Sequence, residues 1–265
     1  MGAKAGVAPG PPLRAGLVVA AHGRHVMVEA EGADRQPERV LCQLRGRGRA
    51  PGHNPSGDLV VGDRVQWRVT GDGGVVEATE PRRNLLFRQD EWRSKSFAAN
   101  LDLMLILVAP EPVFSESQLS RALIAAADAG IPALIGLNKT DLASAPLARK
   151  RLAPYLAMGI DVIELAARRQ PDATRDALQP WLAGRTTLIL GPSGMGKSTL
   201  VNLLVPSAAA QVGEISIALG TGRHTTTSST WYWLDDARSA ALIDSPGFQE
   251  FGLHQIEPER LATLM

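Results

Sequence analysis

The chain has 265 residues, 45% of them hydrophobic, and a formal net charge of +1, a composition that excludes disordered and fibrous proteins and favours two globular domains. The single cysteine, Cys42, excludes an internal disulfide framework and a zinc site of clustered cysteines. No apolar run reaches the ~18 residues needed to span a membrane, so we expect a cytoplasmic protein without a membrane partner.

The N-terminal third combines a tail with a pattern of short strands. Residues 1–12 are rich in Ala, Gly and Pro, and we expect a disordered tail. Within residues 13–81, β-prone runs alternate with glycine-rich turns at 15–20, 25–30, 40–44, 65–70 and 74–78. Five evenly spaced strands predict an all-β OB-fold barrel, a class that binds RNA through strand faces and loops.

Positive charge is concentrated in the same part of the chain. The first 95 residues hold 15 Lys and Arg against 11 Asp and Glu, and Arg45, Arg47 and Arg49 lie on a glycine-rich backbone. An isolated cluster of this size is as often a solvated loop, but within an OB-like barrel we favour contact with RNA phosphates. Residues 82–96 then read as a linker between this domain and the next.

From residue 97 to residue 265 the pattern predicts an α/β domain. A buried strand at 101–109, a helical pattern at 117–129 and a strand at 132–137 form a strand–helix–strand unit, which predicts a mostly parallel sheet. Further elements are expected in chain order: helix 146–155, strand 161–165, helix 173–182, strand 186–190, helix 199–205 and a hairpin of 229–234 with 239–243.

The strand at 132–137 leads directly into the sequence Asn138, Lys139, Thr140 and Asp141. Ligands of open α/β sheets bind at the carboxyl ends of strands. One carboxylate, Asp141, can accept hydrogen bonds from both N1–H and the exocyclic amine of guanine, a donor pair that adenine lacks. We expect Asn138 to tie this loop to the base and to the phosphate loop, and the stem of Lys139 to lie over the purine. Backbone N–H groups of Ala166 and Ala167, after strand 161–165, are expected to contact the guanine oxygen.

A glycine-rich loop between a strand and a helix carries the strongest motif. It consists of Gly191, Pro192, Ser193, Gly194, Met195, Gly196, Lys197 and Ser198, followed by Thr199, and it matches the pattern G-x-x-x-x-G-K-[ST]. Backbone N–H groups and the positive helix end can surround a polyphosphate, Lys197 can neutralise its outer phosphates and Ser198 can ligate Mg²⁺. A glycine-rich connector would explain this motif alone, but together with the 138–141 motif it predicts binding of GTP or GDP.

Two later segments complete the expected site. Residues 220–227 are polar and rich in hydroxyl groups, as a segment that orders around a γ-phosphate and Mg²⁺ would be. The strand at 239–243 leads into Asp244, Ser245, Pro246 and Gly247. We expect Asp244 to hold Mg²⁺ through a water molecule and the Gly247 N–H to contact the γ-phosphate.

The order of these motifs is permuted relative to Ras-like GTPases, in which the phosphate loop precedes the guanine-reading motif. With the N-terminal barrel, the entry segment 97–102 and the Arg223-His224-Thr225-Thr226-Thr227 segment, the chain resembles the RsgA family of GTPases that depend on the small ribosomal subunit. The resemblance implies a circularly permuted P-loop GTPase domain, a partnership with the small subunit and its rRNA, and a role late in subunit maturation. It also implies that His224 positions the attacking water and that Thr226 ligates Mg²⁺. We expect a monomer.

The chain departs from related GTPases in three places. Many GTPases have Ser-Ala where this chain has Ala166-Ala167, and Ras-like enzymes have a water-orienting glutamine where it has Phe248. Members of the family also carry a C-terminal zinc domain with Cys and His ligands, whereas this sequence ends at Met265 without them, as a truncated piece or a natural variant. Zinc is therefore expected for the family but not within these residues.

Three functions are compatible with these patterns. The first is GTP hydrolysis, with Lys197, Gly247 and His224 acting on the γ-phosphate or on water. The second is a non-catalytic RNA-binding module gated by guanine nucleotide, which Phe248 favours. The third is an ATPase or small-molecule kinase, against which the 138–141 motif argues.

Overall fold

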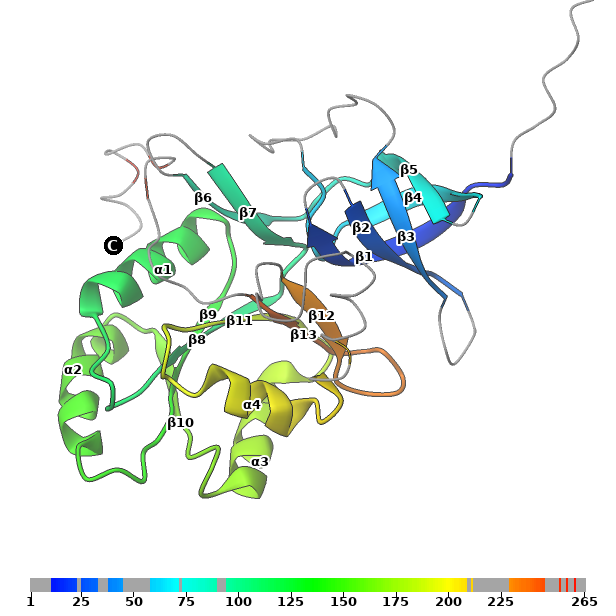
Figure 1. Ribbon diagram of the computed structural model, residues 1–265. Coiled ribbons are helices and arrows are strands. Elements are labelled where there is room, and N and C mark those ends of the chain that lie inside the picture. Colours follow the sequence, from blue (N-terminus) through cyan, green and yellow to red (C-terminus); the bar gives the residue numbers. More distant parts are fainter. Residues whose placement is uncertain are drawn as a thin grey trace, which may run out of the picture.

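The computed structural model describes residues 11–22, 25–32, 38–44, 58–71, 73–89, 94–208, 211, 229–245, 253, 256 and 260. Several predicted residues lie outside these ranges, namely the arginine cluster 45–49, the segment 220–227 and residues 246–248. The expected tail also lies outside them, except for residues 11 and 12. Figure 1 shows a small β-barrel beside a larger domain in which helices surround a sheet.

The barrel consists of β1 (Arg14–His22), β2 (His25–Ala30), β3 (Arg39–Leu44), β4 (Arg64–Thr70) and β5 (Gly73–Thr79). The strands pair in the order β1-β2-β3-β5-β4, and antiparallel pairing of β4 with β1 closes the ring. Alternating residues point inward and form a core that includes Val18, Val26, Cys42 and Trp67. Five strands occur where the sequence predicts them, each within two residues of the expected bounds.

The larger domain is built on five parallel strands, β8 (Leu103–Val108), β9 (Ala133–Leu137), β10 (Asp161–Glu164), β11 (Thr186–Leu190) and β13 (Ala241–Asp244). They lie in the order β10-β9-β8-β11-β13. The antiparallel strand β12 (Thr230–Trp233) pairs with β13 as the predicted hairpin. Every residue of β8 is buried, as expected for a central strand that is covered on both faces.

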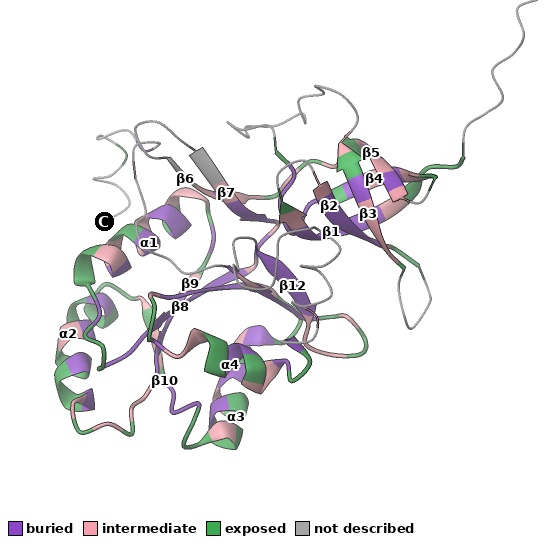
Figure 2. Ribbon diagram, in the orientation of Figure 1, coloured by how far each residue is buried: buried purple, intermediate pink, exposed green. Residues whose placement is uncertain are grey.

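Four helices cover this sheet in the described part of the chain. Figure 1 shows α3 (Pro171–Leu182) beside α4 (Lys197–Leu204) on one face, and α1 (Glu116–Asp128) with α2 (Ala145–Ala157) on the other. Their buried positions face the sheet, and Figure 2 shows this burial concentrated between helices and strands. The connection β8-α1-β9-α2-β10 runs outward in one direction, and the chain then returns over α3 to β11 on the other side of β8. The gap between β8 and β11 is therefore the switch point of the sheet, where such folds bind ligands.

The segment 82–96, which the sequence assigns to a linker, forms structure. It contains β6 (Leu85–Gln89) and the start of β7 (Ser94–Ala99), which pair as an antiparallel hairpin. Leu86 is fully buried and Phe97 is nearly so, both in the core of the larger domain. A two-stranded hairpin is marginal by itself, and here burial of these side chains and packing against α1 stabilise it. The basic residues that suggest a linker hide this apolar contact.

The barrel and the larger domain share one sheet. Strand β1 pairs with β12 through Ala20 and Thr230, so that the sheet continues from β10 at one edge into the barrel. Two core clusters lie on either side of β1: Val18 packs inside the barrel, and Leu17 and Val19 pack with the larger domain. Among the described residues, no helix is long and apolar enough to cross a membrane.

Candidate nucleotide site

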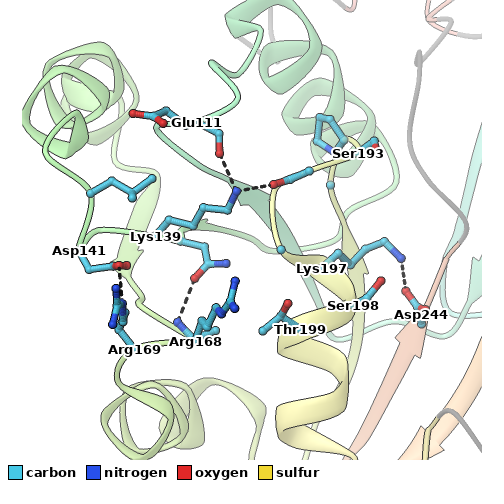
Figure 3. A pocket seen from close by; sticks show the side chains of 17 residues that line it. Glu111, Lys139, Asp141, Arg168, Arg169, Ser193, Lys197, Ser198, Thr199 and Asp244 are labelled. Carbon is cyan, nitrogen blue, oxygen red and sulfur yellow. Dashed lines mark hydrogen bonds and ion pairs between the residues drawn. The ribbon is translucent and has the colours of Figure 1, made fainter.

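The predicted site residues meet in one cleft of about 1010 Å³ at the carboxyl ends of the parallel strands. Asp141, after β9, and Lys197, at the start of α4, both line it although they are far apart in the sequence. Figure 3 shows their side chains on opposite sides of the cleft. The lining residues are Glu111, Asn138, Lys139, Asp141, Leu142, Ala167, Arg168, Arg169, Gly191, Pro192, Ser193, Gly194, Gly196, Lys197, Ser198, Thr199 and Asp244.

The glycine-rich loop takes a backbone path that requires glycine at one position above all. Gly196, directly before α4, has φ +93°, and a Cβ atom there would lie 2.4 Å from Asn138 Nδ2. The loop therefore bends onto the Asn138 side chain and delivers Lys197, Ser198 and Thr199 to the first turn of α4. Free N–H groups and the positive end of the helix dipole face the cleft there, which suits an anionic ligand.

Lys197 and Asp244 form an ion pair across the cleft between Nζ and Oδ1. Both side chains are largely buried, so each charge requires the other in this structure. Burial, and secondly the negative charge of Asp244, raise the pKa of Tyr232 in β12 to about 12. A magnesium polyphosphate would offer new partners to both members of the pair, because phosphate oxygens attract the ammonium group and the metal attracts the carboxylate.

The donor groups at this end of the cleft fit a magnesium ion bound to phosphate. Ser198 supplies a hydroxyl oxygen and Asp244 a carboxylate oxygen from a second element, and Mg²⁺ prefers few protein oxygens together with phosphates and water. Thr226, the third predicted metal ligand, lies outside the described residues, as do the predicted catalytic residues His224 and Gly247.

Asn138 holds the base-reading loop to its two neighbours. Its side chain is buried, its Nδ2 donates to Met195 O at 3.0 Å, and its Oδ1 accepts from the Ala167 N–H at 3.1 Å. The predicted tie to the phosphate loop is thus present. Both ends of the amide are bound to protein, so a contact with a base must share one of these groups.

Lys139 and Thr140 fix the same loop from either side. Lys139 has φ +59°, and its Nζ donates to Glu111 O and Gly194 O at 2.7 Å each. This leaves its stem stretched along the cleft between two loops (Figure 3). Thr140 is not among the lining residues; its Oγ1 donates to Leu165 O at 3.0 Å and so ties the loop to the end of β10.

The two alanines after β10 are buried, and only Ala167 lines the cleft. The Ala166 N–H points to Thr174 Oγ1 at 3.4 Å, and the Ala167 N–H to Asn138 Oδ1. The N–H groups that we expected to read the guanine oxygen therefore have protein partners in this structure. Met195 is similarly buried and contributes its carbonyl group to Asn138 rather than a side chain to the cleft.

Sequence reasoning missed four lining residues: Glu111, Leu142, Arg168 and Arg169. Arg169 Nε lies 3.8 Å from Asp141 Oδ2, so a guanidinium group stands beside the carboxylate that is expected to read the base. The two arginines directly follow Ala166 and Ala167, and position next to a predicted contact was the available signal. Glu111 lies in the loop after β8, which carries no motif.

Comparison with known proteins places this cleft in a protein family. A sequence model of the family described as RsgA GTPase matches residues 79–254. Two curated relatives are named small ribosomal subunit biogenesis GTPase RsgA. The protein from Variovorax paradoxus is 54% identical over 255 residues, covering 96% of this chain and 76% of the relative. The protein from Burkholderia pseudomallei is 52% identical over 248 residues, covering 93% and 75%.

Two solved structures share the fold. The crystal structure of YjeQ from Thermotoga maritima matches with a TM-score of 0.68 and 28% identity, covering 96% of this chain and 81% of that chain. The structure of YloQ, described as a circularly permuted GTPase, matches with a TM-score of 0.63 and 22% identity, covering 98% and 80%. These similarities confirm the predicted fold class, an OB-like barrel followed by a permuted P-loop α/β domain.

Proposed function

The chain belongs to the RsgA GTPase family, and from this premise we propose that it hydrolyses GTP as a late maturation factor of the small ribosomal subunit. The observation that carries the proposal is the shared cleft of Asp141 and Lys197. One group suits the donor edge of guanine and the other suits phosphates, and a single purine triphosphate satisfies both. The sequence reaches them in the reverse of the order found in Ras-like proteins, as a permuted chain must.

The nucleotide end of the mechanism follows from the residues of the phosphate loop. Lys197 and the N–H groups at the start of α4 face the phosphates and stabilise charge that develops on the γ-phosphoryl oxygens during in-line attack by water. Ser198 and Asp244, with Thr226, would hold Mg²⁺, which neutralises the phosphates when bound. The Gly247 N–H contacts the γ-phosphate, and Ser193, Gly191 and Pro192 shape the cradle.

The water-positioning role belongs to His224. Phe248 cannot orient water, because its side chain has no hydrogen-bonding group. His224 lies in a hydroxyl-rich segment that orders only when a nucleotide and RNA supply partners. Turnover of the protein alone is therefore slow, and the small subunit stimulates it. The barrel binds rRNA, the protein acts as a monomer, and its compartment is the cytoplasm.

We expect His224→Ala to retain GTP and GDP binding while subunit-stimulated kcat falls at least about hundredfold, the usual contribution of a positioned proton-transfer group. Phosphate release is measured with and without small ribosomal subunits. His22→Ala, which removes an exposed histidine at the end of β1, is the matched control and keeps its stimulation. Full stimulation of the His224 variant would refute the assignment.

The non-catalytic alternative makes a different prediction for the unmodified protein. A nucleotide-gated RNA-binding module would bind the subunit in a GTP-dependent manner yet release no phosphate above background, with or without subunits. The same release assay therefore separates the two functions.

The ATPase alternative is separated by competition. With Asp141 at the base end, GTP and GDP displace a fluorescent guanine nucleotide, and ATP at the same concentration does not. Asp141→Asn replaces one acceptor oxygen with a donor and weakens guanine binding. Equal competition by ATP and GTP would exclude the guanine-specific reading.

A further inference from the structure

The base end of the cleft is built from polar and aliphatic groups. None of the described lining residues is aromatic, although a purine offers two flat faces that proteins commonly cover with a planar group. The Lys139 stem can cover one face, because its ammonium group is held by Glu111 O and Gly194 O at the cleft wall. The second face requires a group from another loop.

Arg168 is placed to supply that group. It follows Ala167, whose N–H is bound to Asn138, and precedes Arg169, whose Nε lies 3.8 Å from Asp141 Oδ2. Both of its chain neighbours are therefore anchored at the base end. Figure 3 shows the Arg168 side chain extending into the cleft, while that of Arg169 turns toward Asp141. Within the described structure, Arg168 makes no hydrogen bond or ion pair, so its guanidinium group is available to a ligand.

We propose that Arg168 covers the open face of the guanine base, stacking its planar guanidinium group on the purine opposite the Lys139 stem. The inference rests on the proposed function, since it requires a guanine nucleotide in this cleft. Guanidinium is planar and weakly hydrated, and it stacks on aromatic faces better than an ammonium group does. Arg168 is thus a positioning residue for both GTP and GDP, and its contribution does not depend on the γ-phosphate.

A competing role for Arg168 is a salt bridge to the nucleotide phosphates. Its location disfavours this, because the phosphate end already has Lys197 and the N-terminus of α4, and Arg168 emerges beside Asn138. The two roles differ in chemistry. A stacked group can be replaced by an uncharged aromatic ring, whereas a phosphate contact can be replaced only by another cation.

The experiment measures the Kd for GDP by calorimetry on the whole chain with three substitutions at one position. We expect Arg168→Ala to raise Kd about tenfold, equivalent to about 1.4 kcal/mol. Arg168→Phe restores most of the affinity because it stacks without charge. Arg168→Lys restores less because it carries charge without a plane. Arg185→Ala, at the opposite end of β11, is the matched control for loss of one arginine and leaves Kd unchanged.

Steady-state kinetics add a second readout. Because stacking acts equally on the ground state and the transition state, Arg168→Ala raises KM for GTP by the same factor as Kd and changes kcat far less. A merely structural role would instead lower the thermal midpoint, which is measured for all variants. An unchanged Kd in Arg168→Ala, or rescue by Lys but not by Phe, overturns the proposal.

Failure of this inference is distinct from failure of the proposed function. If the unmodified chain binds ATP as well as GDP, or neither, the function itself is wrong. If it binds GDP selectively and Arg168→Ala binds equally well, the function stands and only the role of Arg168 is refuted.

Discussion

At the scale of single residues, the site depends on close approach between two loops that are distant in sequence. Asn138 lies against the phosphate loop, with its Nδ2 bound to Met195 O and directed at the place where a Cβ of residue 196 would be. Only glycine permits this approach, both because of its positive φ and because of the missing side chain. The glycine of the motif therefore serves contact between protein loops as well as access for phosphate.

This contact yields a prediction for Gly196→Ala. The new methyl group displaces Asn138, and the loss of a buried hydrogen bond costs about 1–3 kcal/mol, so we expect GDP to bind at least about tenfold more weakly. Gly184→Ala is the control, since Gly184 also has positive φ, +67°, but nothing lies within 4 Å of its Cβ position. It should lower stability by about 1–2 kcal/mol without changing GDP affinity. Equal effects of both variants on Kd would mean that backbone strain alone matters.

At the scale of elements, a joint of specific contacts fixes the barrel to the larger domain. Fully buried Asp63, just before β4, accepts two hydrogen bonds from Arg82, at 2.6 and 2.7 Å, and one from Val60 N at 2.8 Å. Buried Glu29 in β2 accepts from Trp233 Nε1 in β12 at 2.8 Å and from Arg39 at 2.9 Å. Asn100, with φ +60°, donates to Gly62 O at 2.8 Å. These bonds make the two domains a single packed unit at their contact.

The Asp63 contact yields a prediction for stability. Asp63→Ala leaves Arg82 and the Val60 N–H without their buried acceptor, so we expect a loss of about 3–5 kcal/mol in the free energy of unfolding. Glu38→Ala removes the exposed ion pair with Arg14 and should cost at most about 1 kcal/mol. Urea denaturation measures both. A loss below 1 kcal/mol for Asp63→Ala would show that the joint adds little.

At the scale of the whole molecule, the permuted chain places the barrel on the edge of the sheet that ends beside the nucleotide cleft. Strand β13 carries Asp244, β12 pairs with β13, and β1 of the barrel pairs with β12. Thr230 is the shared residue, since it pairs with both Asp244 and Ala20. An uninterrupted hydrogen-bonded path therefore joins the predicted magnesium ligand to the predicted RNA-binding barrel.

This continuity yields a prediction for unfolding. Because the barrel and the larger domain share a sheet and buried ion pairs, we expect one calorimetric transition, and GDP should raise it as a whole. At a concentration of 100 Kd, GDP stabilises by about 2.7 kcal/mol, which corresponds to roughly 5–10 °C for a chain of this size. Two transitions, of which GDP moves only one, would show that the barrel unfolds independently.

The sequence by itself determined the fold class, the order of the elements and the two motifs that meet in the cleft. These features depend on short-range patterns: alternation in the barrel strands, continuous apolar runs in the parallel strands, and fixed spacing in residues 138–141 and 191–198. Since the carboxyl ends of parallel strands share one edge, motifs at those ends could be expected to converge.

Only the tertiary structure decided what joins distant parts of the chain. It turned the expected linker into the β6–β7 hairpin, because buried Leu86 and Phe97 find an apolar partner that local sequence does not reveal. It also bound the Ala167 N–H to Asn138, brought Arg168 and Arg169 to the cleft, and paired Glu29 with Trp233 across 204 residues. Such contacts depend on how elements pack, and periodicity within one element carries no information about its neighbours in space.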